Sequence, residues 1–198
     1  MRRHLAAACA LAVTLVAGVV APVSNAETAP QTAPTAETTE GTVVLDVGDR
    51  LLKQIRKLRR ETWRWERLMR VRRTTASRAA ELSAELEHRR RILAAWRRKA
   101  AVRRAQAYRP PRVRQWLCIY RHERNPRQGW ATRTGNGFYG GLQMNIGFQR
   151  TYAPELLRKK GTANRWSAIE QIWVAERAYR SGQGFHPWPN TARYCGLL

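Results

Sequence analysis

The stretch from about Val47 to Arg104 restricts the fold of this chain more than any other feature. It contains no proline, its only glycine is Gly48, and residues that favour helices dominate it. Apolar residues recur every seven positions in two companion rows, one with Leu51, Leu58, Trp65, Ala79, Leu86 and Leu93, the other with Val47, Leu68, Leu82 and Trp96. This heptad pattern predicts a long helix or helical hairpin over residues 43–108, interrupted near residues 72–77.

The apolar seam of this segment is not stable in water by itself. It must meet a second copy of the chain, its own other half folded back at Thr74 to Ser77, or another protein. Arginines cover the remaining faces, so a solvated helix that spaces the rest of the chain from a membrane is equally compatible with the sequence. Self-association through the seam and an intramolecular hairpin both stay open.

The first residues have the pattern of a secretory signal. Two arginines at positions 2 and 3 precede an apolar run from Leu5 to Val20, and residues 24–26 offer a small-residue cleavage site. The apolar run is shorter than the ~20 residues that a membrane-spanning helix needs. We therefore expect residues 1–26 to be a signal peptide cleaved near Ala26, and the mature protein to be secreted to the cell wall or cell surface.

Composition also divides the rest of the chain. Residues 27–42 are rich in Thr, Ala, Pro and Glu and have no aromatic or basic residue, which predicts a disordered linker. Pro110 and Pro111 end the helical stretch, because proline removes a backbone donor and restricts the residue before it. A compact domain is expected over residues 112–198.

The formal net charge of +23 comes almost entirely from arginine. Such a surface attracts anions. For an exported chain the candidate partners are anionic cell-wall polymers, peptide-stem carboxylates or a membrane surface, contacted through the basic helix, and nucleic acid is not an expected partner. Arginine bias can alternatively follow from codon usage without a binding role.

The mature chain holds two cysteines, Cys118 and Cys195. In an oxidising exterior an even pair is expected to be bridged. The bridge would stabilise the domain by about 4 kcal/mol on the chain-entropy model.

A carboxylate ends an aromatic stripe at the start of the domain. Residues 113–125 read as a helix halted by Pro126, and Glu123 shares one face with Trp116, Ile119 and Tyr120. Cleavage of a glycosidic bond needs a protonated acid beside a surface that stacks on sugar rings, so Glu123 is the candidate acid. The domain's other glutamates beyond residue 113 are Glu155, Glu170 and Glu176.

The two other domain segments are a hairpin and a capped helix. In RTGNGFYGGLQM, residues 133–144, the Asn136–Gly137 pair signals a tight turn and the next two glycines permit close backbone approach. Ser167 and Glu170 have the spacing of a capping box, which predicts a helix up to Gly182.

These motifs resemble one family. The run from Trp116 to Glu123, then Trp130, TGNGFYGGLQM, EQIWVAERA and a tail with Trp, Pro and Cys are similar to the resuscitation-promoting factor group of transglycosylase-like domains, over about Arg114 to Cys195. The resemblance implies a small lysozyme-like α+β fold, mostly helical with a short hairpin, and action on peptidoglycan glycan strands.

The resemblance also implies roles for individual residues. It makes Glu123 the general acid and places Thr134, Asn136, Tyr139 and Gln143 along the substrate groove. Trp130 and Trp188 are either sugar platforms or core residues, with at least one expected in the core. No cofactor is implied.

Two departures from the family stand beside Glu123. His122 occupies the position where the family usually has a cysteine, and Cys118 lies one helical turn earlier, so a bridge to Cys195 could survive with a one-turn shift. His122 is expected to be a surface or packing residue, since no metal-ligand spacing surrounds it. The stretch RNPRQGW, residues 124–130, is longer and more basic than its family counterpart.

The sequence therefore predicts a secreted lytic transglycosylase or muramidase with one glutamate acid. With a single carboxylate, assistance by the substrate fits better than a scheme with two carboxylates. The alternative is a non-catalytic wall-binding or scaffolding protein that keeps the fold to hold glycan.

Overall fold

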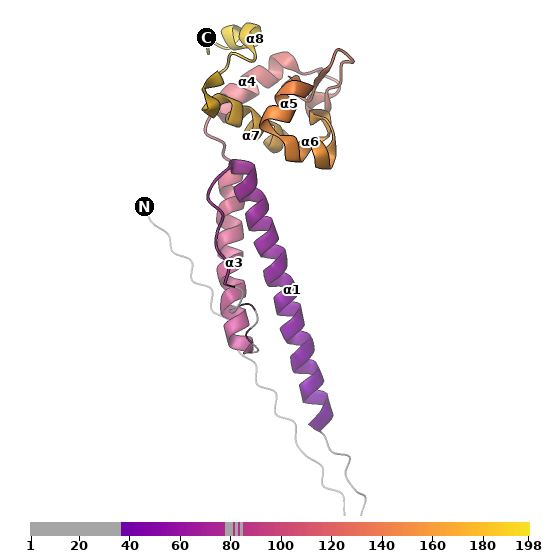
Figure 1. The fold of residues 1–198 in the computed structure, drawn as a ribbon, viewed down its shortest axis with the longest axis vertical. Coiled ribbons are helices and arrows are strands. Elements are labelled where there is room, and N and C mark those ends of the chain that lie inside the picture. The colour runs from indigo at the N-terminus through magenta and orange to yellow at the C-terminus, as the bar shows by residue number, and fades with distance from the viewer. Residues whose placement is uncertain (1–36, 78–80, 82, 84) are drawn as a thin grey trace, which may run out of the picture. The chain divides into compact units, whose positions relative to one another are not determined.

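A computed structural model describes residues 37–77, 81, 83 and 85–198 of the chain (Figure 1). The predicted signal peptide and most of the predicted linker lie outside the described residues. The chain divides into two units, and the second, Thr38–Leu198, holds nearly everything described below. Among the described residues, no helix combines the length and apolarity needed to cross a membrane.

The described elements are mostly helical, with one small antiparallel hairpin, in agreement with the predicted α+β class. They are α1 (Glu37–Met69), α3 (Leu86–Ala107), α4 (Val113–Glu123), a 3-10 turn (Gly129–Ala131), β1 (Phe138–Tyr139), β2 (Met144–Asn145), α5 (Ile146–Tyr152), α6 (Pro154–Lys160), a second 3-10 turn (Ala163–Arg165), α7 (Ala168–Ala178), a π-helical turn (Tyr179–Gln183) and α8 (Pro189–Tyr194).

The predicted helical segment forms two helices that lie side by side (Figure 1). Arg97 on α3 donates a hydrogen bond to Gln54 on α1, and Arg104 donates to Glu61 at 2.8 Å. Both pairs are separated by 43 residues, and a constant separation means that the two helices run parallel. A continuous rod is excluded, because α1 ends at Met69.

Four residues of the heptad rows, Leu51, Leu58, Leu93 and Trp96, lie in the seam between these helices, whereas Ala79 and Leu82 lie outside the described residues. Ile55, Leu93 and Trp96 are buried there, with Leu51 and Leu58 packed against them. The seam is short and narrow, as expected for two helices that bury a single stripe each.

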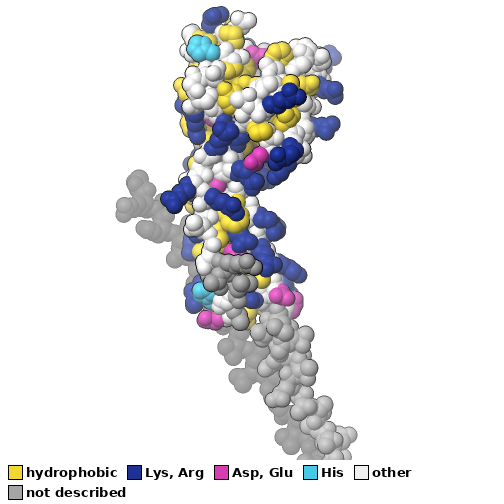
Figure 2. Space-filling model, viewed as in Figure 1, with side chains coloured by type: hydrophobic (Ala, Val, Ile, Leu, Met, Phe, Trp, Pro, Cys, Tyr) yellow, Lys and Arg dark blue, Asp and Glu magenta, His cyan; other side chains and the backbone are white. Residues whose placement is uncertain are grey.

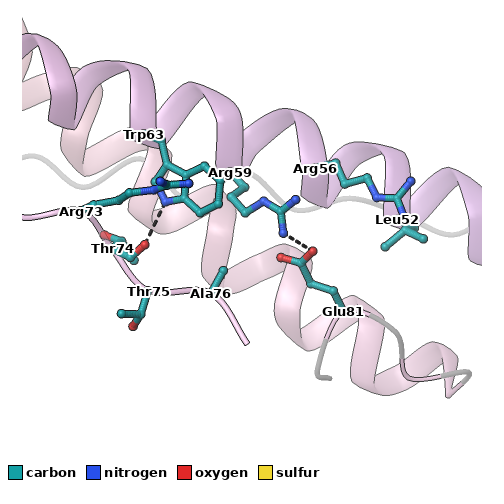
Figure 3. Close-up of a pocket in the computed structure, with 9 residues that line it drawn as sticks. All are labelled: Leu52, Arg56, Arg59, Trp63, Arg73, Thr74, Thr75, Ala76 and Glu81. Atoms are coloured by element: carbon teal, nitrogen blue, oxygen red, sulfur yellow. Dashed lines mark hydrogen bonds and ion pairs between the residues drawn. The ribbon is translucent and has the colours of Figure 1, made fainter. Parts of the chain in front are cut away.

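A return segment, which we define as the described residues 70–77, 81, 83 and 85, lies between α1 and α3 in the chain. Trp63 on α1 donates a hydrogen bond to the carbonyl of Thr74 at 2.8 Å, and Arg59 pairs with the buried Glu81 (Figure 3). Thr74 contacts Trp63, and Glu81, later in the segment, contacts Arg59, which is earlier in α1. The described residues of the segment therefore run antiparallel to α1. The predicted fold-back at Thr74 to Ser77 is therefore part of a long return and not a tight turn.

The domain core collects apolar faces from α4, α7, α8 and the hairpin. Trp116 and Ile119 on α4 are fully buried, and Trp188 before α8 lies 5.2 Å from the Trp116 ring. Val174 and Ala175 on α7 complete the centre of this core. Burial of large aromatic rings contributes most of the apolar area in a domain of this size.

Two glycines let the hairpin approach this core. A side chain at Gly141 would lie 2.6 Å from the Tyr120 ring and 2.8 Å from the Trp130 ring. Gly140 has φ of +81°, and a side chain there would overlap Gln171. The close approach predicted for the two glycines is present, and both positions require glycine.

The end of α1 packs on the domain through α7. Trp65, Leu68, Met69 and Ala107 form an apolar cluster with Trp173 of α7. The indole nitrogen of Trp173 donates to the carbonyl of Ala107 at 2.7 Å. Trp65 and Leu68, the heptad residues at the end of α1, are thus covered by the domain and not by α3 alone.

Candidate active site

Helix α4 places Glu123 at the edge of the core. The indole of Trp116 donates a hydrogen bond to Glu176 at 2.7 Å, and Arg112 donates to the same carboxylate at 2.6 Å. These bonds fix the first turn of α4 against α7. Glu123 is the last residue of the helix, is half-buried, and follows the aromatic stripe that the sequence predicted.

The carboxylate of Glu123 has one protein partner among the described residues. The hydroxyl of Thr191, on α8, donates a hydrogen bond to Oε1 of Glu123. Thr191 is itself nearly buried, so its hydroxyl has little freedom to turn away. The other carboxylate oxygen, Oε2, carries no protein hydrogen bond within the described part of the chain.

A disulfide between Cys118 and Cys195 joins the two helices that hold Glu123 and Thr191. The predicted bridge is present, and it closes a loop of 77 residues. Cys195 stands one helical turn after Thr191. The bridge therefore holds Thr191 within reach of Glu123.

The predicted groove residues form a second group on the hairpin and the loop before it. The Thr134 hydroxyl donates to Asn136 and lies 3.3 Å from Oε1 of Gln143. The Gln143 amide donates to the carbonyl of Gly140 at 2.7 Å, and Gln143 has a φ of +47°. A positive φ is costly for glutamine, so its side-chain bonds keep it in a strained position.

Tyr139 and Gln143 are more buried than Thr134 and Asn136, which are exposed. Tyr139 is half-buried and pairs with Met144 across the hairpin, and Gln143 is 9% exposed. None of these four residues hydrogen-bonds to Glu123 within the described part of the chain. The backbone N–H of Asn125, two residues after Glu123, donates to the Thr132 hydroxyl at 3.0 Å. This bond ties the end of α4 to the loop that leads to Thr134.

The two tryptophans take different positions. Trp130 stacks on Tyr120 with ring centroids 4.0 Å apart and is half-buried. Trp188 is 4% exposed, and its indole donates to the carbonyl of Leu142 at 2.6 Å. Trp188 thus takes the core alternative, whereas Trp130 keeps a partly accessible ring.

Neither arginine beside Glu123 pairs with its carboxylate in the described residues. Arg121 is exposed, and the Arg124 guanidinium lies over the Tyr120 ring at 5.2 Å. His122 is exposed and packs against Tyr194 with ring centroids 4.2 Å apart. The exposure and ring contact of His122 agree with the surface or packing role expected for it.

Ligand atoms of Cys118, His122 and Cys195 lie within 4.8 Å of one another. Zinc and similar ions bind cysteine as a free thiolate. Both sulfurs are consumed by the disulfide, so this cluster offers no metal site in its oxidised form.

The remaining glutamates of the domain have structural partners. Glu170 forms the predicted capping box with Ser167, and Lys160 donates to it at 2.7 Å. Burial raises the pKa of Glu170, but hydrogen bonds from Lys160 and Ser167 outweigh it and leave that pKa below its ordinary value. Glu176 is buried and held by Arg112, and Glu155 is exposed near Arg67 at 3.8 Å.

Sequence reasoning missed Gln171, a buried residue that organises the hairpin. Its amide donates to the carbonyls of Trp130 and Ala163, both at 2.9 Å, and its oxygen accepts from Gly141 at 2.8 Å. Thr191 was missed as well. The spacing of four residues to Cys195 was the available signal, because the predicted bridge already brought that turn to α4.

Comparison with known proteins finds one matching family model. The model of the transglycosylase-like domain family matches residues 111–191, which include Glu123, the hairpin, α7 and Thr191. Residues 111–191 form a transglycosylase-like domain.

Two curated relatives each match about a third of the chain. The resuscitation-promoting factor RpfE of Mycobacterium tuberculosis is 42% identical over 64 residues, which cover 32% of this chain and 34% of the relative. The resuscitation-promoting factor Rpf1 of Corynebacterium glutamicum is 37% identical over 68 residues, 34% of each chain. The chain thus spans about a third of the length of these relatives.

Proposed function

We propose that the transglycosylase-like domain cleaves glycan strands of peptidoglycan outside the cell, with Glu123 as the general acid. The observation that carries the proposal is the position of Glu123: half-buried at the end of α4, with one carboxylate oxygen held by Thr191 and the other without a protein partner. The family match over residues 111–191 supports the substrate class.

The bond from Thr191 has a consequence for proton transfer. Because the Thr191 hydroxyl donates to Oε1, a proton on Glu123 is favoured on Oε2, the free oxygen. An acid works only when its proton is aimed at the leaving oxygen. Thr191 is in this account a positioning residue that directs the proton of Glu123 toward the glycan.

The reaction proceeds with one carboxyl group. Oε2 of Glu123 gives its proton to the glycosidic oxygen after a muramic acid unit, and the bond from that oxygen to C1 breaks. The sugar's own substituents stabilise the oxocarbenium-like state. The C6 hydroxyl then bonds to C1 and returns its proton to Glu123, which leaves an anhydro product and an acid ready for another turn.

Thr134, Asn136, Tyr139 and Gln143 are the groove residues of this proposal, and Trp130 is the sugar platform. One face of the Trp130 ring is taken by Tyr120. A sugar would stack on the opposite face, as aromatic rings do at carbohydrate sites.

Product analysis tests the proposal. The chain without its predicted signal peptide, its Glu123→Gln variant and a Glu155→Gln control are incubated with purified peptidoglycan, and soluble products are identified by mass spectrometry. Glu155 is exposed and only weakly paired, so its loss controls for the removal of one negative charge. We expect anhydro-muropeptides from the wild type and the control, and none from Glu123→Gln.

Other outcomes decide between the alternatives. Ordinary reducing ends would make the reaction a hydrolysis by water. If none of the three proteins released product while all of them sedimented with the wall, the catalytic proposal would fail and the wall-binding scaffold would replace it.

Thr191→Val tests the positioning role separately. Valine keeps the shape of threonine and removes the hydroxyl, so α8 should stay in place. We expect kcat to fall about tenfold with little change in KM, because the proton is no longer directed to one oxygen. A Thr191→Ser variant should recover most of the rate, which a purely structural role of the methyl group would not allow.

A further inference from the structure

A cavity lies where the end of α1 meets α6 and α7. Its volume is about 380 Å³. Three apolar residues contribute to the lining, namely Leu68, Pro154 and Leu156. The charged lining residues are six cations and two carboxylates: Arg64, Arg67, Arg70, Lys159, Lys160 and Arg177, with Glu155 and Glu170. Lys and Arg side chains gather over the same part of the surface in Figure 2.

The two carboxylates are already paired with other cations of the lining. Glu170 accepts two hydrogen bonds from Lys160, each 2.7 Å long, and has Arg64 at 3.7 Å. Glu155 pairs with Arg67 at 3.8 Å. These pairs use five of the eight charged lining residues, so the charges of those five are neutralised in part or in full.

Three cations of the lining have no carboxylate partner among the described residues. They are Arg70, Lys159 and Arg177. Arg177 donates to the carbonyls of Tyr152 and Leu68, both at 2.8 Å, which holds it at the end of α1. Carbonyl groups at a helix C-terminus attract a cation but carry no full negative charge, and Glu155 acts on Arg177 only at longer range than an ion pair.

Arg70 is also strained. It follows α1 directly and has a φ of +52°, a conformation that usually requires glycine or asparagine. Burial, and after it the neighbouring charge of Arg70, lowers the pKa of Arg177 to about 10, although the charge of Glu155 opposes part of this shift. Strained backbone conformations of this kind cluster at functional sites.

We propose that this cavity binds a phosphate group carried on a small organic moiety, with Arg70 and Lys159 as its direct contacts. A phosphate matches the excess of positive charge better than a single carboxylate does, and guanidinium groups bind it with paired hydrogen bonds. The volume exceeds that of a bare phosphate, and Leu68, Pro154 and Leu156 would contact the organic part. The polyol phosphate of a wall polymer and the headgroup of a phospholipid share this chemistry.

This site is separate from the proposed active site. The cavity is lined by α1, α6, α7 and the first residue of the return segment, whereas Glu123 and Thr191 belong to α4 and α8. Phosphate binding therefore goes beyond glycan cleavage and does not depend on it.

Calorimetric titration with sn-glycerol 3-phosphate at fixed ionic strength tests the proposal. The test variant carries Arg70→Gln and Lys159→Gln. The matched control carries Arg72→Gln and Arg158→Gln, which remove the same charge from neighbouring exposed residues outside the cavity lining. We expect the test variant to bind at least about tenfold more weakly than the wild type, and the control to stay within about twofold.

A single Arg70→Gly variant guards against misfolding of the double variant. Glycine is favoured at a φ of +52°, so it removes the charge without disturbing the end of α1. It should weaken binding and leave the far-ultraviolet circular dichroism spectrum unchanged. Equal weakening in the test and control double variants, or no binding by the wild type, would overturn the proposal.

Two further probes test the role of the apolar lining and the source of the bound phosphate group. Inorganic phosphate that binds as tightly as glycerol phosphate would overturn the role of the apolar lining. Co-sedimentation with phosphatidylglycerol vesicles that only the test variant loses would assign the site to a lipid headgroup. Glycerol phosphate binding without such vesicle binding would assign it to a wall polymer.

Discussion

In the parallel pair of α1 and α3, a narrow apolar stripe is flanked by pairs of arginine with glutamate, such as Arg104 with Glu61 and Arg103 with Glu66. In the transglycosylase-like domain, a broad aromatic core is surrounded by buried amides, above all Gln171 and Gln149, that satisfy backbone groups. The first region depends on ion pairs beside its apolar stripe, and the second on close packing and buried hydrogen bonds. Changes of charge should therefore affect the helical segment most, and changes of volume or covalent structure the domain.

The disulfide should give the largest effect. Replacing Cys118 and Cys195 together by alanine removes the constraint on a loop of 77 residues, and we expect the free energy of unfolding to fall by about 4 kcal/mol. Chemical denaturation followed by tryptophan fluorescence measures it. Glycan release should fall as well, because Thr191 loses its tie to α4. A variant as stable as the wild type would show that the core alone holds α8.

Glu66 should give the next largest effect, and it tests the helical segment. Its buried carboxylate accepts from the backbone and the hydroxyl of Thr74 and from Arg103 at 3.0 Å, so it joins α1, the return segment and α3. Glu66→Ala should cost about 3 kcal/mol, because a buried pair loses one partner. Thermal unfolding followed by circular dichroism would detect it. Glu61→Ala, at a more exposed pair, is the matched control and should cost under about 1 kcal/mol.

Gly141→Ala tests packing in the domain. The added methyl group meets the Tyr120 and Trp130 rings at under 3 Å, and overpacking of this kind costs about 2 kcal/mol. Gly135→Ala is a useful contrast, since nothing lies within 4 Å of a side chain there, although its φ of +82° adds strain. Gly141 has no positive φ, so a loss there reports ring contact. A Gly141→Ala variant as stable as the wild type would show that the two rings move aside at no cost.

The smallest expected effect is a difference in pH dependence at Glu170. Its pKa is lowered in the folded protein, so its contribution to stability is present above about pH 4.5 and is lost as pH falls through the folded value. Glu170→Gln should therefore show a smaller drop in melting temperature than the wild type between about pH 6 and pH 3. Identical drops in both proteins would place the acid sensitivity elsewhere.

The sequence predicted much of this structure because its strongest signals are local. The heptad rows identified residues that form the seam, and the capping box of Ser167 with Glu170 and the hairpin glycines lie where the motifs indicated. The family resemblance selected the segment that the family model matches. The disulfide followed from counting cysteines in a chain that was expected to be exported.

What the sequence did not predict depends on contacts between distant residues. A heptad stripe is the same whether its partner helix runs parallel or antiparallel, so the long return segment was not foreseen. α1 also begins at Glu37, within the range predicted as linker. Gln171 and Trp130 are 41 positions apart, and Thr191 and Glu123 are 68 positions apart. No periodic pattern in the sequence marks such hydrogen-bonded pairs.

The account separates two sites, glycan cleavage at Glu123 and phosphate binding beside Arg70. The most direct measurement assays both activities, product release from peptidoglycan and glycerol phosphate binding, on Glu123→Gln and on the double variant of Arg70 and Lys159. We predict that Glu123→Gln abolishes release and keeps phosphate binding, and that the double variant does the opposite. Loss of release in both variants, or full release by Glu123→Gln, would contradict the account.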